Sequence, residues 1–352
     1  MPPEAPVMPS GAGAMEPVRW GIVGFGWVAR DYMAPAIPAA GHRFVAASDP
    51  DPAAREAAAA LGARAYPRVE ALLADPEVEA VYIATPNYLH RAGVEAAARA
   101  GKAVLCEKPM AAALPDAEAM VEACRRAGVL YGTAFDQRHH PAHQAMRDLI
   151  RAGEVGTVTA VRVVYACWVG ADWSACRAAE NWRIDAAKAG GGAMIDLAPH
   201  GLDLVEYLVG EPLEEVRALA QSRVQGYSVD DGALIIGATR SGVLASLHVA
   251  YNCPEALPRR RLEVVGDRSQ LTAENTMGQT PGGTLTLTDG RTGHRRPVAV
   301  DGASPFVNQV AAFSRALRSG DHAAFSGGRD LHTMRLLDRA ARQIGPARDT
   351  AA

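Results

Sequence analysis

Three side chains of this sequence could together take a proton from an alcohol while its hydride leaves. Lys108 supplies an ammonium group and stands between an apolar run and a proline. Asp196 and His200 supply a carboxylate and an imidazole, just past the three glycines at 190–192. A cation, a carboxylate and an imidazole are what a nicotinamide-dependent enzyme needs for proton transfer and for stabilising charge on oxygen.

Asp196 and His200 are four residues apart, so a helix would place them on one face, within mutual reach. An imidazole has an ordinary pKa near neutrality and can accept an alcohol proton. Asp196 could orient the ring and support the imidazolium, or contact the substrate itself. Pro199 is awkward in a helix interior but tolerable in a first turn. A capped helix with a buried His–Asp pair would show the same spacing.

Lys108 follows the predicted strand 103–106 and therefore lies at a carboxyl end of a strand, where α/β folds bind their ligands. At that position its cation could polarise a substrate oxygen or hold the nicotinamide amide. Most lysines are solvated, so a plain loop position is the alternative.

A glycine pattern near the N-terminus predicts a dinucleotide site. Gly24-x-Gly26-x-x-Ala29 lies between a predicted strand and a predicted helix, and Asp49 ends the next strand. Gly24 permits the tight turn and Gly26 lets the backbone approach a pyrophosphate at the helix N-terminus. Asp49 would bind the ribose hydroxyls and repel a 2′-phosphate, which favours NAD over NADP. A glycine turn in an unrelated α/β protein is the alternative.

Strands alternate with helices over the first part of the chain, which predicts a parallel, doubly wound sheet. The helices expected between the strands include 51–62, one ending at Ala100 and 115–127. Pro86 and Asn87 follow the third strand, where Asn87 could contact a ligand, cap a helix, or do both. The predicted strands are 18–23, 44–48, 80–84, 103–106 and 129–135.

After about residue 155 the pattern changes to alternating strands joined by glycine turns, which is typical of an antiparallel sheet in an α+β domain. Two helices are expected at the end of the chain, at 305–319 and 329–344. The predicted strands are 157–165, 213–225, 232–240, 242–251, 260–265 and 283–299.

Bulk properties limit the class of protein. The 352 residues are enough for two domains, and a formal net charge of −3 gives no reason to expect nucleic acid or an anionic membrane as partner. No apolar run approaches the length of a membrane span. Residues 1–16 are rich in Pro, Ala and Gly and are expected to be a disordered leader without a secretion signal. Five cysteines without a Cys-x-x-Cys pattern suit reduced thiols and a cytoplasmic location.

In combination, these motifs make the chain, from about residue 17 onward, resemble the glucose–fructose oxidoreductase, inositol dehydrogenase and rhizopine-catabolism (Gfo/Idh/MocA) family of oxidoreductases. The segments that carry the resemblance are Gly24-x-Gly26-x-x-Ala29, Ala84-Thr-Pro-Asn87-x-x-His90, Gly101-Lys-Ala-Val-Leu-Cys-Glu107-Lys108-Pro109, Arg138-His-His-Pro141, Gly153-Glu-Val-Gly156, Trp182-Arg183, the glycines at 190–192, Asp196-x-x-x-His200-x-x-Asp203 and Asn308-x-x-x-x-Phe313. Ala198 departs from a frequent family glycine, which puts little in doubt.

The resemblance implies an N-terminal Rossmann domain at 17–137 and a C-terminal domain at 138–352 with an open, mostly antiparallel sheet. It implies that this sheet packs face to face into a homodimer or homotetramer. It also implies a cis peptide bond before Pro109, a catalytic set of Lys108, Asp196 and His200, and His200 as general acid and base.

The resemblance and the patterns above together define the expected site. No metal is expected, because the three histidines at 139, 140 and 143 have no carboxylate or cysteine at matching spacing. The residues expected to bind substrate are Lys108, Arg138, Tyr165, Asp196 and His200. Those expected to bind the cofactor are Gly24, Phe25, Gly26, Trp27, Val28, Ala29, Asp49, Thr85, Pro86, Asn87, His90, Glu107, Lys108, Pro109, Trp182 and Arg183.

The sequence therefore predicts an NAD-dependent oxidoreductase that transfers hydride between the nicotinamide and a secondary alcohol of a sugar, cyclitol or polyol. Three alternatives stay open. One is an enzyme that holds NAD tightly for transient oxidation, as a glycosidase or epimerase would. The others are a reductase of a double bond or imine, and a non-catalytic sensor of NAD(H).

Overall fold

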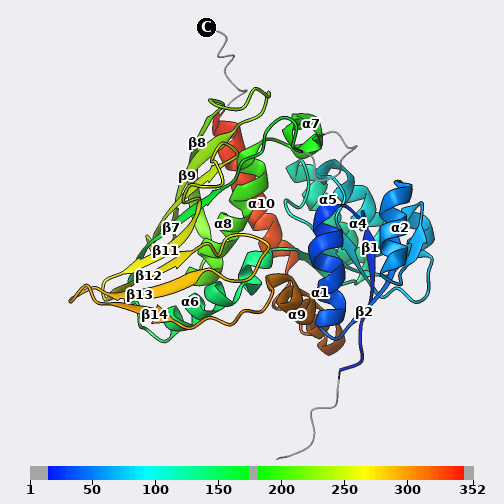
Figure 1. Cartoon of the computed structure of the whole chain (residues 1–352), viewed down its shortest axis with the longest axis horizontal. Coiled ribbons are helices and arrows are strands. Elements are labelled where there is room, and N and C mark those ends of the chain that lie inside the picture. Colours follow the sequence, from blue (N-terminus) through cyan, green and yellow to red (C-terminus); the bar gives the residue numbers. More distant parts are fainter. Residues whose placement is uncertain (1–14, 174–180, 345–352) are drawn as a thin grey trace, which may run out of the picture.

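The computed structural model describes residues 15–173 and 181–344, which form two sheets with helices packed against them (Figure 1). The predicted leader, 1–16, lies outside the described residues apart from its last two, and Cys176 also lies outside them. The first sheet is parallel and the second is mostly antiparallel, which confirms the predicted fold class.

The first sheet has the strand order β3-β2-β1-β4-β5-β6. This is the doubly wound order: strands are added outward from β1 to β3 on one side and from β4 to β6 on the other. Ligands bind at the switch point between β1 and β4. Its strands are β1 (Arg19–Val23), β2 (Arg43–Ser48), β3 (Arg64–Tyr66), β4 (Ala80–Ile83), β5 (Ala103–Cys106) and β6 (Tyr131–Thr133). Its helices are α1 (Ala34–Ala39), α2 (Pro52–Ala60), α3 (Val69–Leu73), α4 (His90–Arg99) and α5 (Leu114–Ala127).

The central strands of this sheet are apolar on both faces because helices cover both. Every residue of β4 and of β5 is buried, which is why these strands read as continuous apolar runs and not as alternating ones. Because parallel strands share one carboxyl edge, the residues that follow β1, β2, β4, β5 and β6 meet there.

The second sheet has the order β14-β13-β12-β11-β7-β10-β9-β8, and β7 with β10 is its parallel pair. Helices α6 (Pro141–Arg151), α8 (Ala193–Val209) and α10 (Gly327–Ile344) contact its strands and lie on one side of it in Figure 1. Its strands are β7 (Val158–Ala166), β8 (Leu213–Gln221), β9 (Gly232–Thr239), β10 (Leu244–Ala250), β11 (Arg260–Gly266), β12 (Ser269–Glu274), β13 (Thr284–Asp289) and β14 (Arg295–Val298).

Helix α9 (Pro305–Ser319) returns from the second part of the chain to pack against the first. The Trp20 ring of β1 lies 5.3 Å from that of Phe313, and its indole nitrogen donates to Ser314 Oγ at 3.2 Å. The expected domain boundary between residues 137 and 138 stays a prediction. Helix α9 follows the second sheet in the sequence but packs against the first part of the chain.

Local differences from the sequence-based expectation have identifiable causes. The helix after the glycine turn contains a π-helical turn, Ala29–Met33, before α1. The predicted strand 129–135 shortens to β6 because a 3-10 helix begins at Asp136. The expected strand 283–299 is the hairpin of β13 and β14, and β12 was missed. Pro199 lies in the interior of α8 and not in its first turn.

Among the described residues, no helix combines the length and apolar character needed to cross a membrane.

Candidate active site

The predicted catalytic residues come together where the carboxyl edge of the first sheet meets helix α8. Lys108 directly follows Glu107 at the end of β5, and its peptide bond to Pro109 is cis, as expected. Asp196 and His200 lie on α8, one turn apart. The site therefore joins a loop of the first sheet to a helix that packs on the second.

Lys108 and Asp196 form a close ion pair. Lys108 Nζ lies 2.6 Å from Asp196 Oδ1 and also donates to the Asp196 carbonyl oxygen at 3.0 Å. The other carboxylate oxygen, Oδ2, accepts a hydrogen bond of 2.5 Å from the Tyr251 hydroxyl. Burial would raise the pKa of Asp196, but the charges of Lys108 and Arg183 and these hydrogen bonds lower it strongly overall. Asp196 is thus a permanent anion held on two sides.

His200 has a different carboxylate beside it from the one expected. Its Nδ1 lies 3.5 Å from Asp136 Oδ1 and, within the described residues, is buried without a hydrogen-bond partner. The Tyr165 ring packs edge-on against the imidazole with centroids 5.5 Å apart. Burial, and then the charge of Lys108, lower the pKa of His200 well below its ordinary value, so the ring is neutral. The orienting role expected of Asp196 therefore has no hydrogen bond to support it, because Asp196 binds Lys108 and Tyr251.

Asp136 belongs to a second group of buried acids beside the ion pair. Burial, and then the charge of Glu107, raise the pKa of Asp136 to about 7. Burial likewise raises the pKa of Glu107, whose carboxylate accepts hydrogen bonds from the Tyr82 hydroxyl and from the Lys108 backbone nitrogen. The site thus has two corners. The first, Asp196 with Lys108 and Tyr251, holds a fixed charge. The second, Asp136 with Glu107 beside His200, holds a carboxyl group whose pKa is raised to about 7.

The N-terminus of α8 is fixed by Asp230, which precedes β9. Its carboxylate accepts from the backbone nitrogens of Gly192 at 2.9 Å and Met194 at 2.8 Å. A Cβ at Gly192 would lie 2.0 Å from the Asp230 carbonyl oxygen, so glycine is required for this approach. The glycine run before Asp196 therefore serves to seat the catalytic helix.

The glycine turn after β1 has the form expected of a dinucleotide site. Gly24 has φ +84°, and a Cβ there would lie 2.9 Å from the backbone of Ala84 and Thr85. Among residues 15–173 and 181–344, no atom lies within 4 Å of a Cβ built on Gly26, so this backbone faces open space there. Asp49 Oδ2 accepts from the Phe25 backbone nitrogen at 2.8 Å and therefore shapes the same turn.

The residues present fit a bound NAD(P). Besides the open approach to Gly26, the hydroxyl of Thr85, which follows β4, is buried and has no hydrogen-bond partner among the described residues. Gly26 to Ala29 would hold the pyrophosphate, Asp49 the ribose, and Thr85 with Lys108 the nicotinamide end. Such a cofactor would supply a hydride donor or acceptor.

Several residues expected in the site have other partners. The two ring nitrogens of His90 lie near backbone carbonyl oxygens, Nε2 at 2.8 Å from Thr85 and Nδ1 at 3.1 Å from Pro109 and Met110, and the one that carries the proton donates to its neighbour, so His90 supports the loop of Lys108. The Asn87 amide donates to the Ala189 carbonyl. These contacts give both side chains a structural part, and their roles in cofactor binding stay predictions.

Arg138, expected at the substrate, is instead part of a buried ion pair. Its Nε lies 2.6 and 2.7 Å from the two carboxylate oxygens of Asp203 on α8. Phe25 likewise turns its ring into the core, stacked on Phe44 at 5.8 Å. Both residues therefore hold elements in place, and their expected roles in ligand binding stay predictions.

Aromatic side chains line the junction of the two parts of the chain. The Arg183 guanidinium lies over the rings of Trp182 and Trp173, at 4.4 and 4.8 Å from their centroids. Trp27, in the glycine turn, packs edge-on against Trp173 at 6.2 Å. The charge of Arg183 also lowers the pKa of Asp196, so this cluster influences the ion pair electrostatically.

Three site residues were missed from the sequence: Tyr251, Asp136 and Asp230. Asp136 follows the last strand of the first sheet, so the carboxyl-edge rule that identified Asp49 and Lys108 applied to it as well. Tyr251 and Asp230 carry no comparable signal, because their contacts depend on how the second sheet packs on α8.

Comparison with known proteins identifies the family. The model described as an oxidoreductase family with an NAD-binding Rossmann fold matches residues 18–135, and the model of the GFO/IDH/MocA C-terminal domain matches 143–272. The chain belongs to the GFO/IDH/MocA oxidoreductases, as its sequence motifs indicated.

Two curated relatives and one solved structure extend the comparison. The 1,5-anhydro-D-fructose reductase of Ensifer adhaerens is 36% identical over 88% of this chain and 91% of its own length. The D-xylose 1-dehydrogenase (NADP(+)) 2 of Haloferax volcanii is 30% identical over 91% of this chain and 95% of its own. The aldose-aldose oxidoreductase of Caulobacter crescentus, crystallised with glycerol, has a TM-score of 0.83 at 26% identity and covers 93% of this chain and 97% of its own.

Proposed function

We propose that this protein is an NAD-dependent oxidoreductase that transfers hydride between the nicotinamide and a secondary alcohol or ketone of a sugar, cyclitol or polyol. The observation that carries the proposal is the 2.6 Å pair of Lys108 and Asp196 beside a buried, neutral His200. The names of the relatives, a sugar reductase and a sugar dehydrogenase, support the substrate class.

Each side chain has a definite part in this reaction. The Lys108 ammonium, held by Asp196, donates to the substrate oxygen and stabilises the charge that develops there. Neutral His200 accepts the hydroxyl proton in the oxidative direction and returns it in the reductive one. Asp196 keeps the ammonium aimed and balances its charge in a buried setting.

The preference for NAD rests on Asp49, whose carboxylate would repel a 2′-phosphate. Arg55 lies close by, with Nη1 donating to the carbonyl oxygens of Asp49 at 2.9 Å and Pro50 at 2.8 Å. Because the Arg55 guanidinium is held by these two carbonyl oxygens, it is not expected to bind a 2′-phosphate. The NADP(+) in the name of the xylose dehydrogenase is the reason to test the preference directly.

Titration of the purified protein with NADH and NADPH, followed by energy transfer from tryptophan, tests the cofactor. NADH is expected to bind at least tenfold more tightly, and Asp49→Ser to narrow that ratio. Trp27→Phe should reduce the transfer signal more than Trp168→Phe, since Trp27 lies in the glycine turn. Tighter binding of NADPH by the wild-type protein would refute the Asp49 argument, and binding of neither would refute the dinucleotide site.

A second candidate is transient oxidation with a cofactor that stays bound, and it is favoured by the name aldose-aldose oxidoreductase of one similar structure, at 26% identity, which describes oxidation and reduction between two aldoses. Protein purified without added nucleotide would then convert a mixture of sugars with no free NAD. If turnover stops on removal of free NAD and resumes on its addition, net redox chemistry is supported and this candidate fails.

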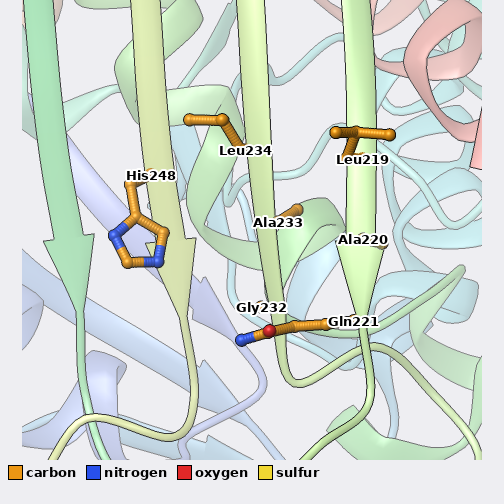
Figure 2. Close-up of a pocket in the computed structure, with 7 residues that line it drawn as sticks. All are labelled: Leu219, Ala220, Gln221, Gly232, Ala233, Leu234 and His248. Carbon is orange, nitrogen blue, oxygen red and sulfur yellow. The ribbon is translucent and has the colours of Figure 1, made fainter.

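We also propose a homodimer or homotetramer formed through the outer face of the second sheet. Leu219 of β8, Ile236 of β9 and Leu244 of β10 are 74%, 52% and 61% exposed there, and such an apolar surface is typical of an interface. Figure 2 shows Leu219, Leu234 and His248 on neighbouring strands of this face, where they line a pocket.

Light scattering during size-exclusion chromatography tests the assembly. Ile236→Lys is expected to release monomers, since a buried ammonium cannot be solvated in the interface, while Arg240→Lys, at the end of the same strand, should leave the mass unchanged. A wild-type monomer at micromolar concentration would refute the proposal. A cytoplasmic location stays a prediction.

A further inference from the structure

We infer that Asp136 is the positioning residue of His200: it accepts the Nδ1–H bond of the imidazole, so that Nε2 carries the lone pair that takes the substrate proton. The inference rests on the proposed function and deepens it. The role of orienting His200, which the helical spacing suggested for Asp196, is thus assigned to Asp136.

The geometry that carries this inference is the relation of the two buried groups. His200 Nδ1 has no hydrogen-bond partner within the described residues, and Asp136 Oδ1 lies 3.5 Å from it. Asp136 and His200 are only 5% and 3% exposed, so water cannot readily replace either partner. Buried polar groups without a partner are costly, and a small ring rotation would convert this separation into a hydrogen bond.

Asp196 is directed to other groups, and the unpartnered His200 Nδ1 receives no hydrogen bond from it within the described residues. Its two carboxylate oxygens already accept from Lys108 and Tyr251. Asp136 Oδ2 accepts a hydrogen bond from Gln137 Nε2 at 2.9 Å, and a hydrogen bond from the Gln137 backbone also acts to lower the pKa of Asp136, which burial raises. Oδ1 is the carboxylate oxygen that lies 3.5 Å from His200 Nδ1.

The position of Asp136 in the fold is also informative. It begins the 3-10 helix Asp136–His139, which joins the first sheet to α6 and the second part of the chain. His200 comes from α8, which packs on the second sheet. The pair therefore forms only when the two parts of the molecule are correctly docked.

The proton balance is simple. In the oxidative direction the substrate O–H bond breaks and an N–H bond forms at Nε2, which gives an imidazolium. The Asp136 carboxylate then holds the Nδ1 proton and offsets the positive charge. In the reductive direction the same N–H bond at Nε2 breaks and the substrate oxygen receives the proton.

The pair is pH-sensitive because Asp136 titrates near neutrality. Burial and the charge of Glu107 raise its pKa to about 7. Below that pH the carboxyl donates to Nδ1, which leaves the imidazole proton on Nε2, where it blocks the base. Oxidation should therefore rise with pH through about 7. The titratable groups that interact with Asp136 or His200 are Tyr82, Glu107, Lys108, His143, Tyr165 and Asp196.

The first experiment compares the pH dependence of kcat/KM for alcohol oxidation in wild type and Asp136→Asn. The wild type is expected to show an ascending limb near pH 7, and Asp136→Asn to lose that limb and to fall roughly 10- to 100-fold at pH 8. Its Kd for NADH should stay within about twofold. Asp75→Asn, which removes a buried carboxylate bonded to Arg64 and Tyr66, should keep both the limb and the rate.

A second measurement does not depend on turnover. Nitrogen-15 spectra of the histidines, with the His200 signal assigned by its loss in His200→Gln, report which ring nitrogen carries the proton. At pH 8 the wild type should show Nδ1–H, and the tautomer should change as pH falls through about 7. An Nε2–H imidazole at pH 8 overturns the inference whatever the activity. A wild type that binds no dinucleotide and oxidises no alcohol refutes the proposed function alone.

Discussion

The two corners of the active site hold their carboxylates in opposite ways. Asp196 is surrounded by donors, from Lys108 and Tyr251, and its pKa is strongly lowered. Asp136 lies among other acids, and burial raises its pKa to about 7. Both are buried side chains within one site, so local hydrogen bonds and neighbouring charges, and not depth, decide which one titrates.

This difference separates positioning from proton transfer. A permanent anion at Asp196 can hold a cation in place throughout the reaction without changing its own state. A titrating acid beside the imidazole can follow the proton that His200 gains and loses. Sites that push the pKa values of two like groups apart assign them different tasks.

The largest effect is expected from removing the cation of the first corner. Lys108→Ala should lower kcat/KM by about 10²–10³-fold, because the developing charge on the substrate oxygen loses its donor and Asp196 loses its partner. Lys102→Ala is the matched control, since Lys102 flanks the other end of β5 and donates to the Asp75 and Val78 carbonyls. Steady-state kinetics with a sugar or polyol substrate would check this. Equal losses in both variants would argue against a special role for Lys108.

A smaller effect should follow from removing the second donor to Asp196. Tyr251→Phe deletes the 2.5 Å hydrogen bond, and a bond to a charged group contributes roughly 1.5–3 kcal/mol. Asp196 keeps its ion pair, so kcat should fall about tenfold and not a thousandfold. Tyr227→Phe, which removes a bond to the Val169 carbonyl, should leave kcat unchanged. An unaltered kcat in Tyr251→Phe would mean that Lys108 alone fixes the carboxylate.

Much of the first sheet could be predicted because its signals are local. Buried strands, glycine turns and the rule that ligands gather at carboxyl ends led to Gly24, Asp49 and Lys108 directly. The helical spacing of Asp196 and His200 was also correct. It did not reveal the hydrogen-bond partners of Asp196, because residues four apart on a helix are within reach of each other but also of whatever packs across from them.

The remainder depended on tertiary packing. Tyr251 reaches Asp196 from the end of β10, and Asp230 seats α8 from the start of β9, which no short-range pattern records. The basic side chain of Arg138 looked like a substrate ligand, and only the fold brings Asp203 against it. The sequence predicted which groups come together in the candidate site better than it predicted their hydrogen-bond partners.

The thermal stability of Asp136→Asn should show, independently of activity, whether the Asp136 charge is unfavourable in the folded protein. A carboxyl group whose pKa is raised on folding stabilises the native state below its unfolded pKa near 4, and that stabilisation is lost as pH rises through about 7. At pH 8 the wild type therefore carries a buried, unfavourable charge at Asp136. Asp136→Asn should raise Tm at pH 8 by roughly 3–8 °C and raise it less at pH 5, where the carboxyl is neutral in the folded state and ionised only in the unfolded state.

Asp75→Asn is the same chemical change, but it is expected to shift Tm in the opposite direction at pH 8. Burial would raise the pKa of Asp75, but hydrogen bonds from the Glu77 backbone, Arg64 and Tyr66 lower it overall, so its charge stabilises the fold above the unfolded pKa and that contribution is lost as pH falls through the folded pKa. Its loss should lower Tm at pH 8. Calorimetry of both variants at the two pH values would check this. If Asp136→Asn were destabilising at pH 8, its carboxylate would be a paired anion like Asp196, and the contrast between the two corners would disappear.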